Sequence, residues 1–285
     1  MDWLIEPLGF GFFQRALLAG VLVGGLCGAL SVFVVQRRMS SIGHGLAHSV
    51  LGGVGIALAL GVHEYLGAAA ATAVAAVLID RVGRRRGLHV DAAIWIVTTA
   101  LFALGVVVVS RVEGVGVSTE SLLFGDVLGV GTADLLLIGG VSGAFAILLL
   151  ARWKALVFTT FDHDVAAAMG VAAGRNEALL NLATAAVVVA SVRVLGVLLI
   201  ASAVVLPAAL ARLLTASFGR LMAVATLVGS AAAVVGLYAS FHLNAPSGST
   251  IVLTGTTAFA AVLVVVAART ALARRRGIAE ALRAP

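Results

Sequence analysis

Two histidines stand in an otherwise apolar stretch of this sequence, and their spacing suits a metal ion. His44 and His48 lie in a run of small and apolar residues that follows Arg37 and Arg38. On a helix, side chains four residues apart share one face, so both imidazoles can reach a single ion. His48 lies ten residues beyond Arg38, about 15 Å along a helix, which would place it near the middle of a bilayer. Ionisable side chains at that depth are rare and usually functional.

The alternative for the same two side chains is structural. Each could be a buried histidine that hydrogen-bonds a helix carbonyl. The adjacency of the pair and the glycines around it favour the metal-binding interpretation.

The composition indicates which elements must position these histidines. The chain has 285 residues, of which 61% are hydrophobic and 11% are charged. A soluble domain carries about 25% charged residues, so this is predicted to be an all-α polytopic membrane protein with one transmembrane domain over residues 1–285. The N-terminal segment is acidic and shows no cleavage site, and the single cysteine, Cys27, excludes a disulfide framework.

The apolar runs predict eight or nine transmembrane helices. They fall near residues 14–35, 43–62, 65–79, 92–110, 134–151, 178–192, 195–214, 221–241 and 250–268. The division around Arg193 is open, because residues 178–214 could form one broken helix. Pro207 lies inside the later run and is expected to kink or break it.

The basic residues predict the orientation of the chain. If the spans alternate, every Lys and Arg except Arg15, Arg111 and Arg193 falls on the side of the C-terminus. Positive loops stay in the cytoplasm, so the C-terminus is predicted to be cytoplasmic, with the N-terminus outside for nine spans and inside for eight. The net charge of +6 is thus explained by membrane topology, and we expect no nucleic-acid partner.

Acidic residues gather in the segments assigned to the outer side. They are Glu64, Glu113, Glu120, Asp126 and Asp134. Such a cluster could raise the local concentration of cations at an entrance. Ordinary solvated loops are the equally open alternative.

The longest cytoplasmic segment, about residues 152–177, predicts one docking helix. Its centre has an acidic start, an alanine-rich middle and a glycine stop at Gly170. We expect Asp162 or Asp164 to cap this helix rather than to form a metal cluster with His163.

No motif for ATP hydrolysis or proteolysis is found. The one lysine, Lys154, is followed by Ala155, so a phosphate-binding loop is excluded. The chain is therefore predicted not to be an enzyme, and any nucleotide hydrolysis requires a separate subunit.

Several segments, taken in order, resemble the membrane-spanning permease of zinc/manganese ABC importers, the metal-chelate uptake family. The segments are 5–7 (IEP) with 13–17 (FQRAL), 33–39 (FVVQRRM) with 43–52 (GHGLAHSVLG), 122–126 (LLFGD), 161–166 (FDHDVA) with 169–170 (MG), 194–199 (VLGVLL) with 206–209 (LPAA) and 211–214 (ARLL), and 246–248 (PSG) with 250–253 (TIVL). They occur in this order over most of the length of the chain.

The resemblance implies a homodimeric permease, related in fold to vitamin B12 and siderophore permeases, in the cytoplasmic membrane of a prokaryote. It implies a pair of cytoplasmic ATP-binding subunits and an extracytoplasmic protein that delivers Zn²⁺ or Mn²⁺ as the transported substrate. No permanently bound cofactor is expected. The docking residues would be Asp162, Asp164, Ala166, Met169 and Gly170, and the metal ligands His44 and His48.

One departure from the family pattern bears on the metal. The family pair is usually an aspartate followed four residues later by a histidine, and the aspartate position is His44 here. Imidazole suits zinc, whereas carboxylate oxygen better suits manganese, so zinc is favoured over manganese. In a homodimer two such pairs could supply four nitrogens to one tetrahedral ion.

Three other functions are weighed against this one. A siderophore permease would be longer and would lack the paired histidines. A proton-coupled secondary carrier would need acidic or histidine side chains in several spans and an internal repeat. A non-transporting scaffold would leave the histidines without a role.

Overall fold

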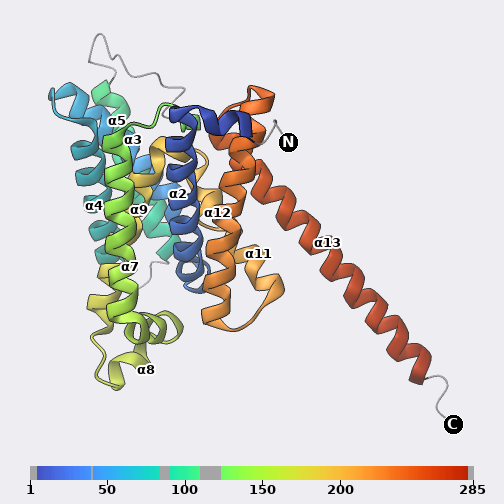
Figure 1. Ribbon diagram of the computed structural model, residues 1–285. Helices are drawn as coiled ribbons and strands as arrows, with labels where there is room; N and C mark the ends of the chain where they lie inside the picture. Colours follow the sequence, from blue (N-terminus) through green and yellow to red (C-terminus); the bar gives the residue numbers. More distant parts are fainter. Residues whose placement is uncertain (1–4, 40, 84–89, 110–122, 282–285) are drawn as a thin grey trace.

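The structure, a computed structural model, describes residues 5–39, 41–83, 90–109 and 123–281, and all of the regular secondary structure among them is helical (Figure 1). The elements are η1 (Glu6–Gly9), α2 (Gly11–Gln36), α3 (Ile42–Ala59), α4 (Glu64–Gly83), α5 (Val90–Val109), α7 (Thr132–Phe161), α8 (His163–Ala168), α9 (Ala173–Leu195), α10 (Ile200–Ala203), α11 (Leu206–Leu214), α12 (Phe218–Leu243) and α13 (Ser247–Ala281). The all-α fold class is confirmed.

Eight described helices are long and apolar enough to cross a membrane, and a shorter apolar segment, Ile200–Leu214, forms a further connection. Just before this connection, the end of α9 lies against the start of α13, since a Cβ on Gly248 would lie 2.7 Å from the carbonyl oxygen of Leu195. At its other end, Arg212 Nη1 donates a hydrogen bond to Oε1 of Gln36, the last residue of α2, at 2.6 Å. The described residues therefore pass between the two ends of the bundle nine times, once as a broken segment.

This count agrees with the nine-span alternative. The first residues of α2 and the end of α13 lie at opposite ends of the molecule (Figure 1). The end of the bundle that holds Arg37, Arg81, Arg175 and Arg212 is called here the arginine-rich end. Basic loops stay in the cytoplasm, so the opposite end, where α2 begins, is called the outer end.

Pro207 lies at a break between helices and not at a kink inside one. It stands in the first turn of α11, where the missing N–H breaks no helical hydrogen bond. The preceding long helix, α9, has already ended at Gly196, whose φ of 75° leaves the helical region. The helix is thus broken within residues 178–214. A break in this range was one of the alternatives in the sequence analysis.

Glycines let α2 and α12 approach closely. A Cβ on Gly24 would lie 2.4 Å from the carbonyl oxygen of Gly229, and one on Gly28 would lie 2.3 Å from that of Ala225. Small residues at this spacing allow helices to approach closely. Gly139 and Gly143 of α7 have the same spacing, but a Cβ at either position would meet nothing within 4 Å in the described part of the chain.

Helices α3, α4 and α5 pack into one group, called here the α3–α5 group. A Cβ on Gly53 of α3 would lie 2.2 Å from the carbonyl oxygen of Gly67 in α4. A Cβ on Gly105 of α5 would lie 2.1 Å from the Cα of Gly52. Because backbones meet directly at these points, the group has little freedom to shear, and it carries both His44 and His48.

Candidate functional site

The two histidines meet on one face of α3. Nε2 of His48 lies 2.9 Å from Nε2 of His44, within hydrogen-bond distance, and both rings are partly buried. Their ring centroids are 4.4 Å apart with the planes nearly perpendicular. The spacing of four residues therefore brings together the two nitrogens that could share an ion.

The nitrogen separation is close to that of a zinc site. Two imidazole nitrogens bound to one tetrahedral Zn²⁺ at about 2.05 Å would be about 3.3 Å apart. The observed 2.9 Å fits a hydrogen bond between the rings, so a small rotation of either ring would admit an ion.

Aromatic side chains of α5 cover the pair. The ring centroid of Trp95 lies 5.5 Å from that of His44, and the centroid of Phe102 lies 5.1 Å from that of His48. These apolar faces limit the access of water from the α5 side. Nδ1 of His48 is buried without a hydrogen-bond partner in the described part of the chain.

The depth of the histidines differs from the sequence estimate. The chain turns after α2, with a φ of 56° at Arg38, and α3 begins only at Ile42. His48 is six residues further on, about 9 Å along the helix axis. The expected depth of about 15 Å along one helix from Arg38 is therefore wrong, and the pair lies in the half of α3 nearer the arginine-rich end.

Within the described ranges, one chain provides only two of the ligands a metal ion needs. No group of three or more His, Cys, Asp or Glu side chains is placed to bind a metal there. A structural Zn²⁺ takes four ligands, so the remaining ligands would come from outside the described residues of this chain.

Residues 161–170, at the centre of the predicted docking segment, are called here the coupling segment. They fold as expected from their sequence. Asp162 is the N-cap of α8, and its Oδ1 accepts a hydrogen bond from the backbone N–H of Val165 at 2.9 Å. Asp164 lies in the first turn, and Ala166 is buried. Gly170 follows the helix with a φ of 77°. The predicted cap and glycine stop are confirmed, although α7 continues past Arg152 to Phe161 before α8 begins.

An apolar face is exposed at this segment. Phe161, Val165 and Met169 are 62%, 49% and 65% exposed. Phe161 ends α7, Val165 lies in α8 and Met169 is the C-cap of α8, so the three side chains flank the break between the helices at Asp162. Exposed apolar side chains outside the membrane mark interaction surfaces.

A junction that the sequence did not predict lies at the outer end. A Cβ on Gly196 would lie 2.4 Å from the backbone nitrogen of Gly125, and one on Gly248 would lie 2.2 Å from the carbonyl oxygen of Phe124. Leu198 N–H also donates to the carbonyl of Leu123 at 3.2 Å. Three of the resembling segments, 123–126, 194–199 and 246–248, thus meet at one point. Each of the three segments contains a glycine, and this was the feature of the sequence that could have indicated a close contact.

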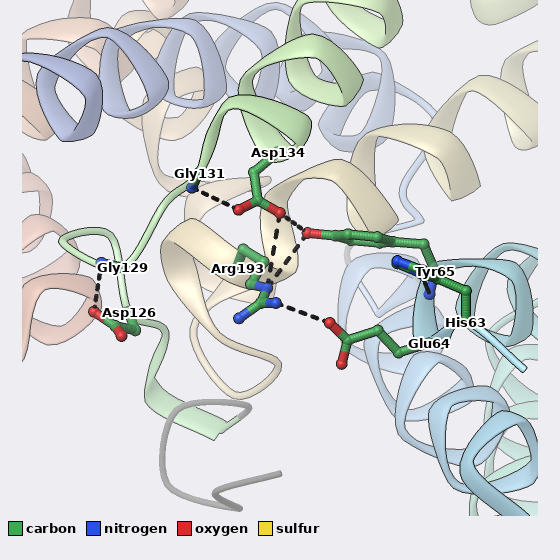
Figure 2. Close-up of polar contacts among 8 residues, drawn as sticks. All are labelled: His63, Glu64, Tyr65, Asp126, Gly129, Gly131, Asp134 and Arg193. Carbon is green, nitrogen blue, oxygen red and sulfur yellow. Dashed lines mark hydrogen bonds and ion pairs between the residues drawn. The ribbon is translucent and has the colours of Figure 1, made fainter. Parts of the chain in front are cut away.

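Next to this junction, Arg193 joins three helices (Figure 2). Its Nη2 donates to Oε1 of Glu64 at 2.8 Å, and its Nε donates to the hydroxyl of Tyr65 at 3.4 Å. The same Nε lies 3.8 Å from Oδ1 of Asp134, to which the Tyr65 hydroxyl also donates. The backbone N–H of Gly131 donates to Oδ2 of Asp134 at 2.8 Å. We call Glu64, Tyr65, Asp134 and Arg193 the Arg193 cluster.

Neither interpretation of the outer acidic residues describes Glu64 and Asp134. Glu64 and Asp134 are paired with Arg193, and Asp134 is only 8% exposed. Oδ1 of Asp126 accepts from the N–H of Gly129 at 3.0 Å. These carboxylates serve the structure of the outer end. Glu113 and Glu120 lie outside the described residues.

Comparisons with known proteins agree with this architecture. Residues 9–266 match the family described as "ABC 3 transport family". The chain is 33% identical to the manganese transport system membrane protein MntC of Halalkalibacterium halodurans, over 90% of this chain and 87% of that protein. It is 31% identical to the chelated iron transport system membrane protein YfeC of Yersinia pestis, over 91% of this chain and 88% of that one.

A solved structure supports the same assignment. The chain resembles PsaBC from Streptococcus pneumoniae in complex with Fab, with a TM-score of 0.80 and 32% identity over 91% of this chain and 94% of that chain. Since the family match and these relatives cover most of the chain, the protein belongs to the ABC 3 transport family, as a multi-pass permease of metal importers and not an enzyme.

Proposed function

We propose that this chain is the membrane-spanning subunit of an ATP-driven importer in the cytoplasmic membrane of a prokaryote, and that its divalent metal ion binds at His44 and His48. The observation that carries the proposal is the 2.9 Å separation of the two Nε2 atoms on one face of α3. A partly buried pair of imidazoles inside a transmembrane helix has no evident structural need for this arrangement.

A second copy of the chain would complete the site. Each chain supplies two nitrogens, and a two-fold dimer presents the same patch from both subunits. Two pairs would give four imidazoles, which is a tetrahedral zinc coordination set. The homodimer is therefore part of this proposal.

Zinc is the metal that the ligands favour. Imidazole nitrogen suits zinc, and manganese prefers carboxylate oxygen. Manganese is the second candidate, because relatives such as the H. halodurans protein are named as manganese transport proteins.

Transport would proceed by alternating access. A binding protein delivers the ion to the outer end, and the ATP-binding subunits dock on the exposed apolar face of Phe161, Val165 and Met169. Hydrolysis in those subunits shifts α8 and α9 and exposes the histidine pair to each side in turn.

A proton-coupled carrier fits the sequence less well. Between Glu177 and Glu280 the chain contains neither Asp nor Glu, so the later spans offer no acidic proton relay. Nor does the sequence contain a phosphate-binding loop, which agrees with a separate ATP-binding subunit.

The test is uptake of radioactive zinc and manganese by cells that make the native permease or the His48→Ala variant at equal protein levels. We expect zinc uptake to fall at least tenfold in the variant and manganese uptake to be low in both. His242→Ala is the matched control, because His242 lies in the last turn of α12 and not on α3. Undiminished uptake by His48→Ala would show that the histidines are structural.

A further inference from the structure

Helix α9 connects the two ends of the bundle and begins directly after the coupling segment. At its inner end, Glu177 forms an ion pair with Arg37 of α2. Asn176 accepts a hydrogen bond from Nη1 of Arg152 in α7 at 3.2 Å. At its outer end, Arg193 holds α4 and α7 through the Arg193 cluster. A displacement of the coupling segment would therefore reach the outer end through one continuous helix.

The Arg193 cluster links the α3–α5 group, whose helix α3 carries the histidine pair, to α9. Glu64 and Tyr65 are the first residues of α4, and α4 belongs to the α3–α5 group. Backbone contacts at Gly53–Gly67 and Gly52–Gly105 hold that group together. A rigid group that carries His44 and His48 is thus tied to α9 by side chains at one end.

The space behind the cluster is incompletely filled. A cavity of about 30 Å³ lies between α3, α4 and α9. Its lining consists of Val50, Val54, Glu64, Tyr65, Ala68, Val189, Val192 and Arg193. The polar contacts of the cluster therefore lie beside a small pocket, about the size of one water molecule, that is lined mainly by apolar side chains of α3, α4 and α9.

The cluster contains one cation for two carboxylates. Arg193 is half-exposed, whereas the side chains of Glu64 and Asp134 are 23% and 10% exposed. Without Arg193, both carboxylates would lose their cationic partner, and only the Tyr65 hydroxyl would still link α4 to Asp134 of α7. Like charges close together repel, and this repulsion would loosen α4.

We propose that Arg193 is a positioning residue for transport: it holds the outer end of the α3–α5 group on α9, and this contact opens and closes once in each transport cycle. The inference rests on the proposed function, since it assigns the movement that exposes the histidine pair to the outer side. Arg193 acts through Glu64 and Tyr65 and does not touch the metal.

The first test measures the coupling of transport to ATP hydrolysis. The complete importer, with its ATP-binding subunits and metal-loaded binding protein, is reconstituted in vesicles with the native chain or with Arg193→Ala. We expect the metal ions moved per ATP hydrolysed to fall at least fivefold, while hydrolysis continues. Arg193→Lys, which keeps one positive charge near Glu64, is expected to restore most of the ratio. Arg15→Ala, which changes an exposed arginine at the same end of the bundle, is the matched control.

The second test follows the opening directly. In a Cys27→Ala background, Val54→Cys places a thiol in the cavity behind the cluster. A membrane-impermeant maleimide added outside should label it slowly in the resting protein. Labelling should accelerate at least fivefold with Arg193→Ala, and also in the otherwise unchanged chain during ATP turnover. Arg15→Ala should leave the rate unchanged.

These readouts separate the two proposals. Native coupling and native labelling rates in Arg193→Ala would overturn the role of Arg193. Absence of metal transport by the intact complex would overturn the proposed function, yet the labelling rate of the resting protein would still report on the contact. If Arg193→Ala does not assemble, Glu64→Gln removes only the more exposed ion pair. It should change both readouts in the same direction, and no change in either would count against the role.

Discussion

Gly125 and Gly196 occupy each other's side-chain space at the outer end of the bundle. A Cβ on Gly196 would lie 2.4 Å from the backbone nitrogen of Gly125, and one on Gly125 would lie 2.7 Å from the nitrogen of Gly196. Both residues have positive φ angles, 78° and 75°. The loop before α7 and the end of α9 therefore join through backbone alone, which only glycine permits at both positions.

Substitution at this junction should be severe. We expect Gly196→Ala to lower the free energy of unfolding by about 3 kcal/mol or more, because backbone strain and overpacking each cost about 1–3 kcal/mol. The measurement is thermal unfolding of the purified permease in detergent. Gly139→Ala is the control, since its Cβ would meet nothing within 4 Å. A native melting temperature for Gly196→Ala would contradict the close contact.

The sequence predicted the helices well and their mutual contacts poorly. Apolar runs of about 20 residues have few alternatives to a transmembrane helix, because buried backbone groups must bond within the segment. The cap at Asp162 and the stop at Gly170 were also predictable, since they depend on neighbours a few residues away. The junction of Gly125 with Gly196 depends on residues far apart in the chain, and no local pattern encodes it.

For the candidate site, too, the sequence predicted local features better than contacts between residues far apart in the chain. The i, i+4 spacing correctly placed His44 and His48 together, because helix geometry is local. Their depth was misjudged because the turn at Arg38 could not be read from composition. Arg193 was noted only as an exception to the charge asymmetry. An arginine inside an apolar run, on the side where acidic residues gather, was the available signal for the cluster with Glu64 and Asp134.

The metal preference should respond to the ligand at position 44. His44→Asp replaces one imidazole by a carboxylate, which adds a negative charge and an oxygen ligand that suits manganese. We expect the ratio of manganese to zinc uptake to rise about tenfold. Competition uptake with both radioactive metals measures this ratio. His44→Asn, which adds an oxygen without the charge, is the matched comparison, and an unchanged ratio in His44→Asp would show that this position does not select the metal.

The exposed apolar face of the coupling segment should govern assembly with the ATP-binding subunit. Met169→Asp places a charge on a side chain that is 65% exposed, so folding should be preserved. Burial of that charge at an interface would be costly, and we expect affinity for the ATP-binding subunit to fall at least tenfold. Co-purification at graded concentrations measures the loss. Met169→Leu should bind normally, and equal binding by Met169→Asp would place the docking surface elsewhere.

The ion pair between Arg37 and Glu177 should stabilise the inner end of α9 on α2. The two side chains are 10% and 26% exposed, and Arg37 Nη1 also donates to Oδ1 of Asn181 at 3.4 Å. A partly buried pair of this kind leaves an uncompensated charge when either partner is removed. In a double-mutant cycle of Arg37→Ala and Glu177→Ala, we expect a coupling energy of about 1–2 kcal/mol in the free energy of unfolding. Additive effects of the two substitutions would show that this ion pair does not couple the inner end of α9 to α2.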